Sequence, residues 1–511
     1  MKKIKIFAFV IFIISFIVIL FYGMFGINIS FKSIKEIKEK RKPNVDLITS
    51  LKINNIDAVF DKENNIFYYM VSDKYENETY ILNFNLDSSY KYKIVDETLN
   101  IIKVDYNKKF KVIIYNNKYY FETNIQLTNL PIINIVAEDN IVEDVESIFN
   151  YVNVNHSQML FSNNSKIHVR GNTSKNFDKK SYKINMYNKN YNNEKEVNLS
   201  NFYYGNSFVL DAIYRDASKI RNLLATELWN DISNDFMNIN IYSEFVELFI
   251  NNEYKGLYLL TEPINRRKFN LNKSTSQDTS VVIKTQQWND INSNLDFSNI
   301  TTDTYLGYEL KYPNNEELYK KSWNMLLSNI SKFYDKNVDS SYQTISSIFN
   351  IENYIDMMIF NAFTNNIDNN LDKNNYFYIK SLKNNKVFIQ PWDMEYTFGI
   401  RYKTNEERNA YKDMEDFNEI YTGFYHENAP EINKLLIDRY WELRQDILNK
   451  EYFDNLLNKY LTELNKGAAL RDSNKWYEYD VEKEIEEIRT WIYNRIEFFD
   501  EYVKGLENEE S

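Results

Sequence analysis

The chain has 511 residues, 43% of them hydrophobic, and a formal net charge of −12. This hydrophobic fraction excludes a disordered chain, and the length predicts two or three domains rather than one core. With no cysteine, three histidines and no basic block, the sequence excludes disulfides and Cys-ligated metal centres, and it argues against both a His-based metal site and a nucleic-acid partner.

The first predicted element is a membrane anchor. Residues 6–25 form an uncharged apolar run, and about twenty such residues span a bilayer as a helix. The run is longer than the apolar core of a cleavable signal peptide and lacks a small-residue exit, so we expect an uncleaved single-pass transmembrane helix within residues 1–28. Lysines lie on both sides of the run and leave the orientation open. The signal-like arrangement favours an extracytoplasmic location for the rest of the chain.

A charged linker over residues 29–45 and a small domain over residues 46–125 are expected next. Short runs such as IFYYMV, TYILNF and KFKVII recur in this second segment, separated by Asn, Asp and Lys turns. Runs of this length and spacing are typical of a β-sandwich-like domain.

Residues 130–505 are predicted to form one larger domain that mixes strands and helices. Two strands flank Gly171, and a helix is expected from Asp216 to Asp231 with Asp216 as its N-cap. The segments FVELFI and LYLLTE form a predicted hairpin around the turn NNEYKG, and the chain becomes mainly helical after Tyr312. The predicted fold class is therefore α+β.

Cationic side chains gather around the turn at Gly171. Arg170, Lys180 and Lys183 lie on or beside the two predicted strands. Cations on a strand next to a glycine turn can hold the oxygens of a triphosphate. A solvated strand face is the alternative, and composition alone favours that alternative.

The predicted helix that follows carries three polar residues of interest. Arg221 and Asn222 lie beside its apolar stripe, and Glu227 lies elsewhere on the same helix. A helix glutamate that pairs with a strand lysine can position that lysine against a phosphate. An ordinary surface helix is the alternative.

A loop, two short strands and an acidic turn follow one another between residues 361 and 399. Asp368 lies in the Asn-rich loop, Asn375 precedes the first strand, and Asp393 follows the second strand. Phosphoryl transfer needs one carboxylate that orients the attacking hydroxyl and another that holds Mg²⁺, often with an amide oxygen. Asp368 fits the first role, Asp393 the second and Asn375 the third, although a single loop aspartate is more often a turn residue.

Five stretches of the chain resemble, in order, the motifs of the CotH kinase family. They are RGNTSKNFDKKSYKI, LDAIYRDASKIRNLLATEL, VELFINNEYKGLYLLTEPI, NNIDNNLDKNNYFYI and IQPWDMEYTFG, which together lie within residues 130–450. The resemblance implies an atypical protein kinase-like fold and transfer of the ATP γ-phosphate to Ser or Thr of protein substrates, with spore-coat proteins as the associated substrates.

The resemblance also implies roles for individual residues. It implies that Asp368 is the catalytic aspartate, that Asp393 is a metal ligand with Asn375 as a second ligand, and that Lys180 contacts phosphate. Arg221 and Asn222 would frame the site. Glu395 stands where the family more often has aspartate, which leaves its role as a further metal ligand open.

The interval from Asp368 to Asn375 is longer than the usual kinase spacing. This departure makes Asn374 and Asp372 alternative partners of Asp368.

The sequence therefore predicts a membrane-anchored Ser/Thr protein kinase-like enzyme that uses ATP and Mg²⁺. The alternative is a surface or spore-coat assembly protein with a vestigial nucleotide site. A third hypothesis is a carbohydrate- or cell-wall-binding module, suggested by the aromatic residues and the β domain.

Overall fold

The structure, a computed structural model, describes residues 34–510 with internal gaps. The gaps are residues 98–99, 139–140, 156–159, 172–173, 201–202, 234–239, 277–278, 286–299, 306, 334–341, 367–374, 381–385 and 401–429. The predicted transmembrane segment, residues 6–25, lies outside the described residues. Among the residues that are described, no helix is both long and apolar enough to cross a membrane.

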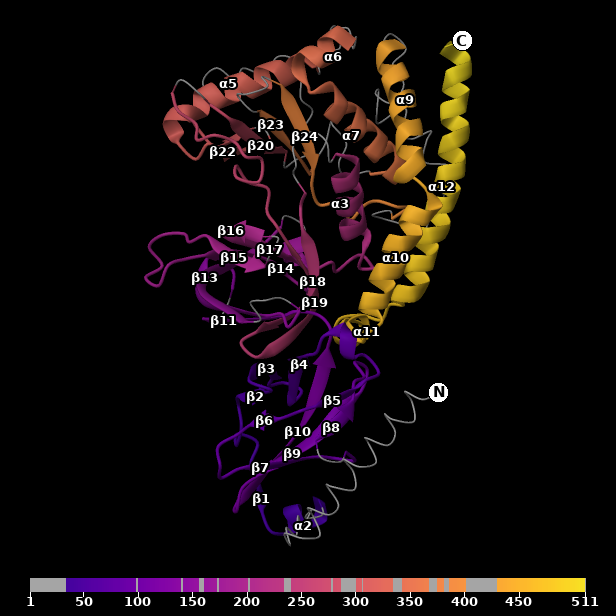
Figure 1. Cartoon of the computed structure of the whole chain (residues 1–511). Coiled ribbons are helices and arrows are strands. Elements are labelled where there is room, and N and C mark those ends of the chain that lie inside the picture. The colour runs from indigo at the N-terminus through magenta and orange to yellow at the C-terminus, as the bar shows by residue number, and fades with distance from the viewer. Residues whose placement is uncertain are drawn as a thin grey trace, which may run out of the picture.

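A mainly antiparallel sheet forms the N-terminal part of the molecule (Figure 1). Its strand order is β6-β2-β3-β4-β10-β9-β7, and β1 pairs with β10. A separate two-stranded sheet joins β5 to β8. The short helix α2 (Ile34–Glu39) precedes the strands, whose bounds are β1 Lys42–Pro43, β2 Leu51–Ile53, β3 Ile56–Asp61, β4 Ile66–Met70, β5 Thr79–Ile81, β6 Phe84–Asn85, β7 Lys91–Ile94, β8 Ile101–Lys103, β9 Lys109–Tyr115 and β10 Tyr119–Thr128.

A closed barrel of seven strands occupies the middle of the molecule. Its order is β11-β12-β13-β14-β17-β19-β18, closed by the parallel pairing of β11 with β18. Its interior is apolar, with alternate residues such as Ile133 and Ile135 buried inside. The barrel strands are β11 Ile132–Ala137, β12 Val145–Val152, β13 Leu160–Arg170, β14 Ser181–Met186, β17 Ser207–Asp211, β18 Ser243–Ile250 and β19 Glu253–Thr261, and the small pair β15 Val197–Ser200 and β16 Tyr203–Gly205 lies outside it.

The C-terminal part combines a five-stranded sheet with helices. The sheet order is β21-β22-β20-β23-β24, and in Figure 1 α5 and α6 lie above the sheet while α12 runs along one side of the molecule. The sheet strands are β20 Val281–Thr285, β21 Thr304–Tyr305, β22 Tyr308–Tyr312, β23 Tyr376–Lys380 and β24 Val387–Pro391. The helices are α3 Arg221–Ile232, α5 Glu316–Phe333, α6 Tyr342–Ile348, α7 Ile351–Thr364, α9 Pro430–Asp446, α10 Lys450–Leu464, α11 Ala468–Lys475 and α12 Val481–Glu510.

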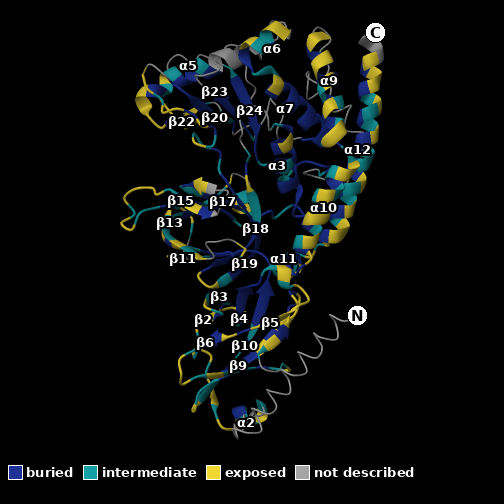
Figure 2. Cartoon of the chain, viewed as in Figure 1, coloured by how far each residue is buried: buried dark blue, intermediate teal, exposed yellow. Residues whose placement is uncertain are grey.

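The architecture is thus a mixed α+β fold, with the helices concentrated in the C-terminal part. One large apolar cluster joins α3, α7, α9, α10 and α12 to the five-stranded sheet. The inward faces of the helices and the central strands are buried, and exposed residues follow the outer faces (Figure 2).

The predicted start of α3 at Asp216 is wrong by five residues. The helix begins at Arg221, because Lys219 adopts a left-handed backbone with φ 64° and interrupts any helix from Asp216. Asp216 still caps the helix from outside, since its carboxylate accepts a hydrogen bond from the Arg221 N–H at 2.9 Å. The N-cap position belongs to Ile220, so the prediction of Asp216 as N-cap is wrong, although its carboxylate does bind the first helical N–H.

The predicted hairpin is confirmed as β18 and β19. Asn251 and Asn252 form its turn with φ values of 53° and 61°, a left-handed conformation that asparagine tolerates better than most residues.

Candidate functional site

An open cavity lies where the barrel, α3 and the turn after β24 meet. The space between its walls measures about 370 Å³. Its charged and amide side chains come from the ends of four elements: Arg170 from β13, Asp211 from β17, Asn222 from α3, and Asp393 just after β24. Segments far apart in the sequence therefore bring two carboxylates, an amide and a guanidinium to one place.

Asn222 connects the two acidic walls of this cavity. Its side-chain amide donates a hydrogen bond to Asp211 Oδ2 at 3.0 Å, and its carbonyl oxygen accepts one from the backbone N–H of Met394 at 3.1 Å. The first residues of α3 thus fix the end of β17 against the turn that carries Asp393. The resemblance had assigned Asn222 to the frame of the site.

Asp393 lies in a turn with unusual backbone geometry. Asp393 has φ 61° and Asn375 has φ 66°, and the Trp392 N–H donates to the Asn375 carbonyl at 2.7 Å. Non-glycine residues held in the left-handed region are uncommon and cluster at functional sites. Burial raises the pKa of the Asp393 carboxyl, and the nearby charge of Asp211 raises it further, against the opposing effect of Arg170 and Lys284.

Cationic groups face these carboxylates. The Arg170 guanidinium lies over the Trp392 ring, 5.9 Å from its centroid. Lys284 of β20 has a pKa lowered to about 8, chiefly by burial and then by the charge of Arg170, while Asp393 acts in the opposite direction. A lysine whose charge is disfavoured by neighbouring cations is well suited to receive an anion.

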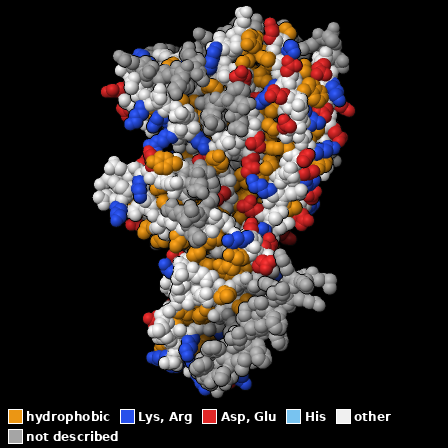
Figure 3. Space-filling model, viewed as in Figure 1, with side chains coloured by type: hydrophobic (Ala, Val, Ile, Leu, Met, Phe, Trp, Pro, Cys, Tyr) orange, Lys and Arg blue, Asp and Glu red, His pale blue; other side chains and the backbone are white. Residues whose placement is uncertain are grey.

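Two further lysines extend this cationic group. Burial, followed by the charges of Lys311 and Arg170, lowers the pKa of the Lys183 ammonium. Lysine and arginine side chains also gather on the face of the molecule shown in Figure 3, at the level between the five-stranded sheet and the barrel.

Sequence reasoning missed Lys284 and Lys311. The available signal was a lysine within the otherwise apolar strand VVIKT, where a charge needs a partner.

Three predicted ligand-binding residues have their polar groups engaged elsewhere. The Lys180 ammonium donates to backbone carbonyls of its own loop, at 3.0 Å to Lys175 O. Arg221 is buried and pairs with Asp216 at 2.5 Å. Glu227 pairs with Lys459 of α10 at 3.2 Å rather than with a strand lysine.

The predicted metal ligands are only partly assembled. Asn375 contributes its carbonyl to the turn, and Glu395 lies in the same turn as Asp393 but does not line the cavity. Within the described part of the chain, no three Asp, Glu or His side chains are grouped so as to hold a metal ion. Asp368 and its alternative partners Asp372 and Asn374 lie outside the described residues.

Comparison with known proteins gives one match. A family model described as CotH kinase protein matches residues 167–499, about two thirds of the chain. This region extends from β13 into α12 and contains every side chain of the cavity described above. No curated protein matches the chain significantly.

Proposed function

Because the chain belongs to the CotH kinase family, we propose that it is a protein kinase-like phosphotransferase that uses ATP and Mg²⁺ to phosphorylate Ser or Thr of protein substrates. The observation that carries this proposal is the opposition of charges in the cavity. Asp393 and Asp211 provide the carboxylates, Arg170 and Lys284 are the cations whose charges act on Asp393, and Lys183 lies near Arg170.

The two carboxylates suit a magnesium–phosphate complex. Mg²⁺ in nucleotide sites is held by one or two carboxylates together with the phosphates themselves, so a cluster of three protein acids is not required. Burial raises the pKa of Asp393 and the nearby Asp211 carboxylate raises it further, and a divalent cation would offset both effects. When bound, Mg²⁺ neutralises charge that develops on the transferred phosphoryl group.

The cations would bind the phosphate oxygens of the nucleotide. Arg170 can offer two parallel N–H donors to phosphate oxygens, and its guanidinium lies over the Trp392 ring. Lys284 and Lys183 would add positive charge along the phosphates. The three residues come from β13, β14 and β20, so a bound nucleotide would bridge the barrel and the five-stranded sheet.

We propose Asp368 as the group that orients the substrate hydroxyl. The segment before it is fixed next to the Asp393 turn, because the Phe398 N–H donates to the Thr364 carbonyl at 2.8 Å. Asn365, in a left-handed conformation, ends α7 at the same place.

The test is phosphate transfer from labelled ATP by the purified full chain to candidate surface and coat proteins. Asp393→Asn is expected to lose both Mg²⁺-dependent ATP binding and transfer. Asp368→Asn is expected to keep binding and to lose transfer by roughly 100-fold or more, as expected for a general base. Asp438→Asn, an exposed position on α9, serves as the matched control and should behave as the wild type.

If both site variants transfer phosphate at the wild-type rate, this assignment is wrong. If the wild type shows neither transfer nor a thermal shift with ATP and Mg²⁺, a coat or surface assembly protein becomes the better interpretation.

We also propose that residues 6–25 anchor the enzyme in a membrane, with the kinase-like part on the extracytoplasmic side. Protease treatment of intact cells tests this orientation, since it should remove the kinase-like part only if that part is exposed.

A further inference from the structure

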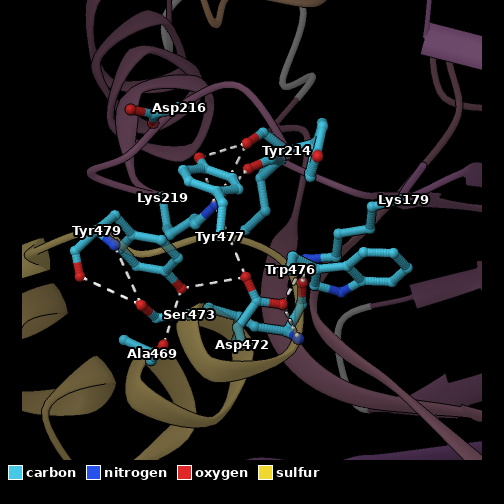
Figure 4. A network of polar contacts seen from close by, with 12 residues as sticks. Lys179, Tyr214, Asp216, Lys219, Ala469, Asp472, Ser473, Trp476, Tyr477 and Tyr479 are labelled. Carbon is cyan, nitrogen blue, oxygen red and sulfur yellow. Dashed lines mark hydrogen bonds and ion pairs between the residues drawn. The ribbon is translucent and has the colours of Figure 1, made fainter. Parts of the chain in front are cut away.

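A second polar network lies behind the cavity, around Asp472 of α11 (Figure 4). The Asp472 side chain is fully buried between two lysines that are themselves buried. Its Oδ1 accepts hydrogen bonds from Lys179 Nζ at 2.7 Å and from the Leu257 N–H at 2.9 Å. Its Oδ2 accepts one from the Tyr479 hydroxyl at 3.1 Å and lies 3.7 Å from Lys219 Nζ.

Lys219 carries this network into the segment between β17 and α3. Its ammonium donates to the Ile213 carbonyl at 3.0 Å, which closes the loop from Ile213 to Lys219. The Tyr477 hydroxyl donates to the Tyr214 carbonyl at 2.5 Å and lies 3.3 Å from Lys219 Nζ. Figure 4 shows the rings of Tyr477 and Tyr479 on either side of the Lys219 side chain.

The two ends of this loop carry residues of the cavity. Asp211 ends β17 just before the loop, and Asn222 lies in the first turn of α3 just after it. Left-handed backbone at Ile213 and Lys219, with φ values of 41° and 64°, shows that the loop is held in a conformation that β-branched and long side chains rarely adopt. Such a conformation persists only where surrounding contacts impose it.

The hairpin between β18 and β19 is shaped to admit the Asp472 carboxylate. A Cβ on Gly256 would lie 2.2 Å from Asp472 Oδ1, and Gly256 has φ 103°. The glycine thus lets the carboxylate reach the next backbone N–H, that of Leu257. The buried Asp472 carboxylate of α11 thus contacts Leu257 of the barrel and Lys219 of the loop.

We propose that Asp472 is a positioning residue: its carboxylate, through Lys219, fixes the segment 211–222 so that Asp211 and Asn222 face Asp393. This inference rests on the proposed phosphotransferase function of the cavity. Asp472 is not a catalytic residue, since it lies behind the loop and does not line the cavity.

The first test measures the loop directly by hydrogen exchange on the full chain, and it does not depend on catalysis. Asp472→Asn keeps the size of the side chain and removes its charge. We expect exchange in the segment 211–222 to rise about tenfold or more, whereas strand β18 stays protected. Lys219→Gln should give the same rise in exchange, and Tyr477→Phe a smaller rise. These two variants test the inference even if Asp472→Asn does not fold.

The second test compares catalysis with stability. Arg471→Gln removes the neighbouring buried charge of α11, which pairs with Glu247 of β18, whereas Lys219 of the loop pairs with Asp472. Asp472→Asn and Arg471→Gln should both lower the melting temperature. When each variant is assayed well below its own melting temperature, only Asp472→Asn should lower kcat, by about tenfold. An equal loss of kcat in both would mean that Asp472 acts only through stability.

Unchanged exchange in segment 211–222 in both Asp472→Asn and Lys219→Gln would overturn the inference. If the wild type transfers no phosphate, the proposed function fails, and the exchange result still decides whether Asp472 fixes the loop.

Discussion

Burial and the neighbouring charge of Arg170 lower the proton affinity of the Lys284 amine. Its amine lies in strand β20 beside Arg170 and Asp393, and its pKa is lowered to about 8. Near neutral pH, the amine is therefore mostly charged, and it loses its proton at a lower pH than an ordinary lysine does. A phosphate bound against it would favour the charged form.

This shift predicts a pH dependence of ATP binding. Below pH 8 the Lys284 ammonium is charged and available to phosphate, whereas above pH 8 a proton must be taken up on binding. The affinity for Mg²⁺-ATP should therefore fall as the pH rises through about 8, by up to about tenfold per unit. Titration calorimetry between pH 6.5 and 9.5 measures this slope.

Lys284→Arg provides the control, because arginine stays charged throughout this pH range. The variant should bind with little change over the same interval. An identical slope in both proteins would assign the pH dependence to another group.

At the scale of elements, local patterns predicted strands better than helix boundaries. The strands at residues 376–380 and 387–391 follow from short runs rich in apolar residues between polar turns, and the hairpin turn follows from Asn251 and Asn252. The start of α3 does not follow from local pattern. Asp216 binds the Arg221 N–H from five residues upstream, and Lys219 between them pairs with Asp472, which is far away in the sequence.

The site was predictable only in part, for a related reason. Asp393 and Asn222 could be chosen from motifs, because their neighbours in sequence carry the signal. The part played by Asp211 and Lys284 depends on barrel closure and sheet pairing, in which strands far apart in the sequence meet. The motif predicts Lys180 as a phosphate contact, whereas the Lys180 amine donates to carbonyls of its own loop.

Gly256 gives a prediction for the contact between the hairpin and α11. Gly256→Ala would place a methyl group against the Asp472 carboxylate and force alanine into a backbone with φ 103°. We expect the free energy of unfolding to fall by about 2 to 4 kcal/mol, from strain and from the displaced buried charge. Chemical denaturation measures the change.

Gly505→Ala is the matched control within α12. No atom lies within 4 Å of a Cβ at that position. Alanine should stabilise the helix there by up to about 1 kcal/mol. A Gly256→Ala protein as stable as the wild type would show that the hairpin and α11 can separate without cost.

At the scale of the whole molecule, the N-terminal sheet is packed firmly against the barrel. Tyr68 and Met70 of β4 share one buried apolar cluster with Phe249 and Tyr254 of the β18–β19 hairpin. Arg471 of α11 adds a buried ion pair with Glu247, donating also to the Tyr106 carbonyl at 3.2 Å.

The N-terminal sheet should therefore unfold together with the rest of the described structure. Arg471→Gln leaves the Glu247 carboxylate buried without its counter-ion, which should cost about 3 to 5 kcal/mol. Calorimetry should show one transition, shifted to lower temperature.

Lys450→Gln is the control: it breaks an exposed ion pair with Glu497 and should change the free energy of unfolding by less than about 1 kcal/mol. Two separate transitions in the wild type would contradict this view.

Closure of the barrel has a consequence for how the protein associates with itself. A closed barrel has no outer strand, so each of its strands pairs with a neighbour on both sides. Recruitment of a foreign strand, as in aggregation or domain swapping, would have to begin on the open sheets, at outer strands such as β6, β7 and β21. Charged substitutions that discourage fibre growth are best introduced on those strands, away from the cavity.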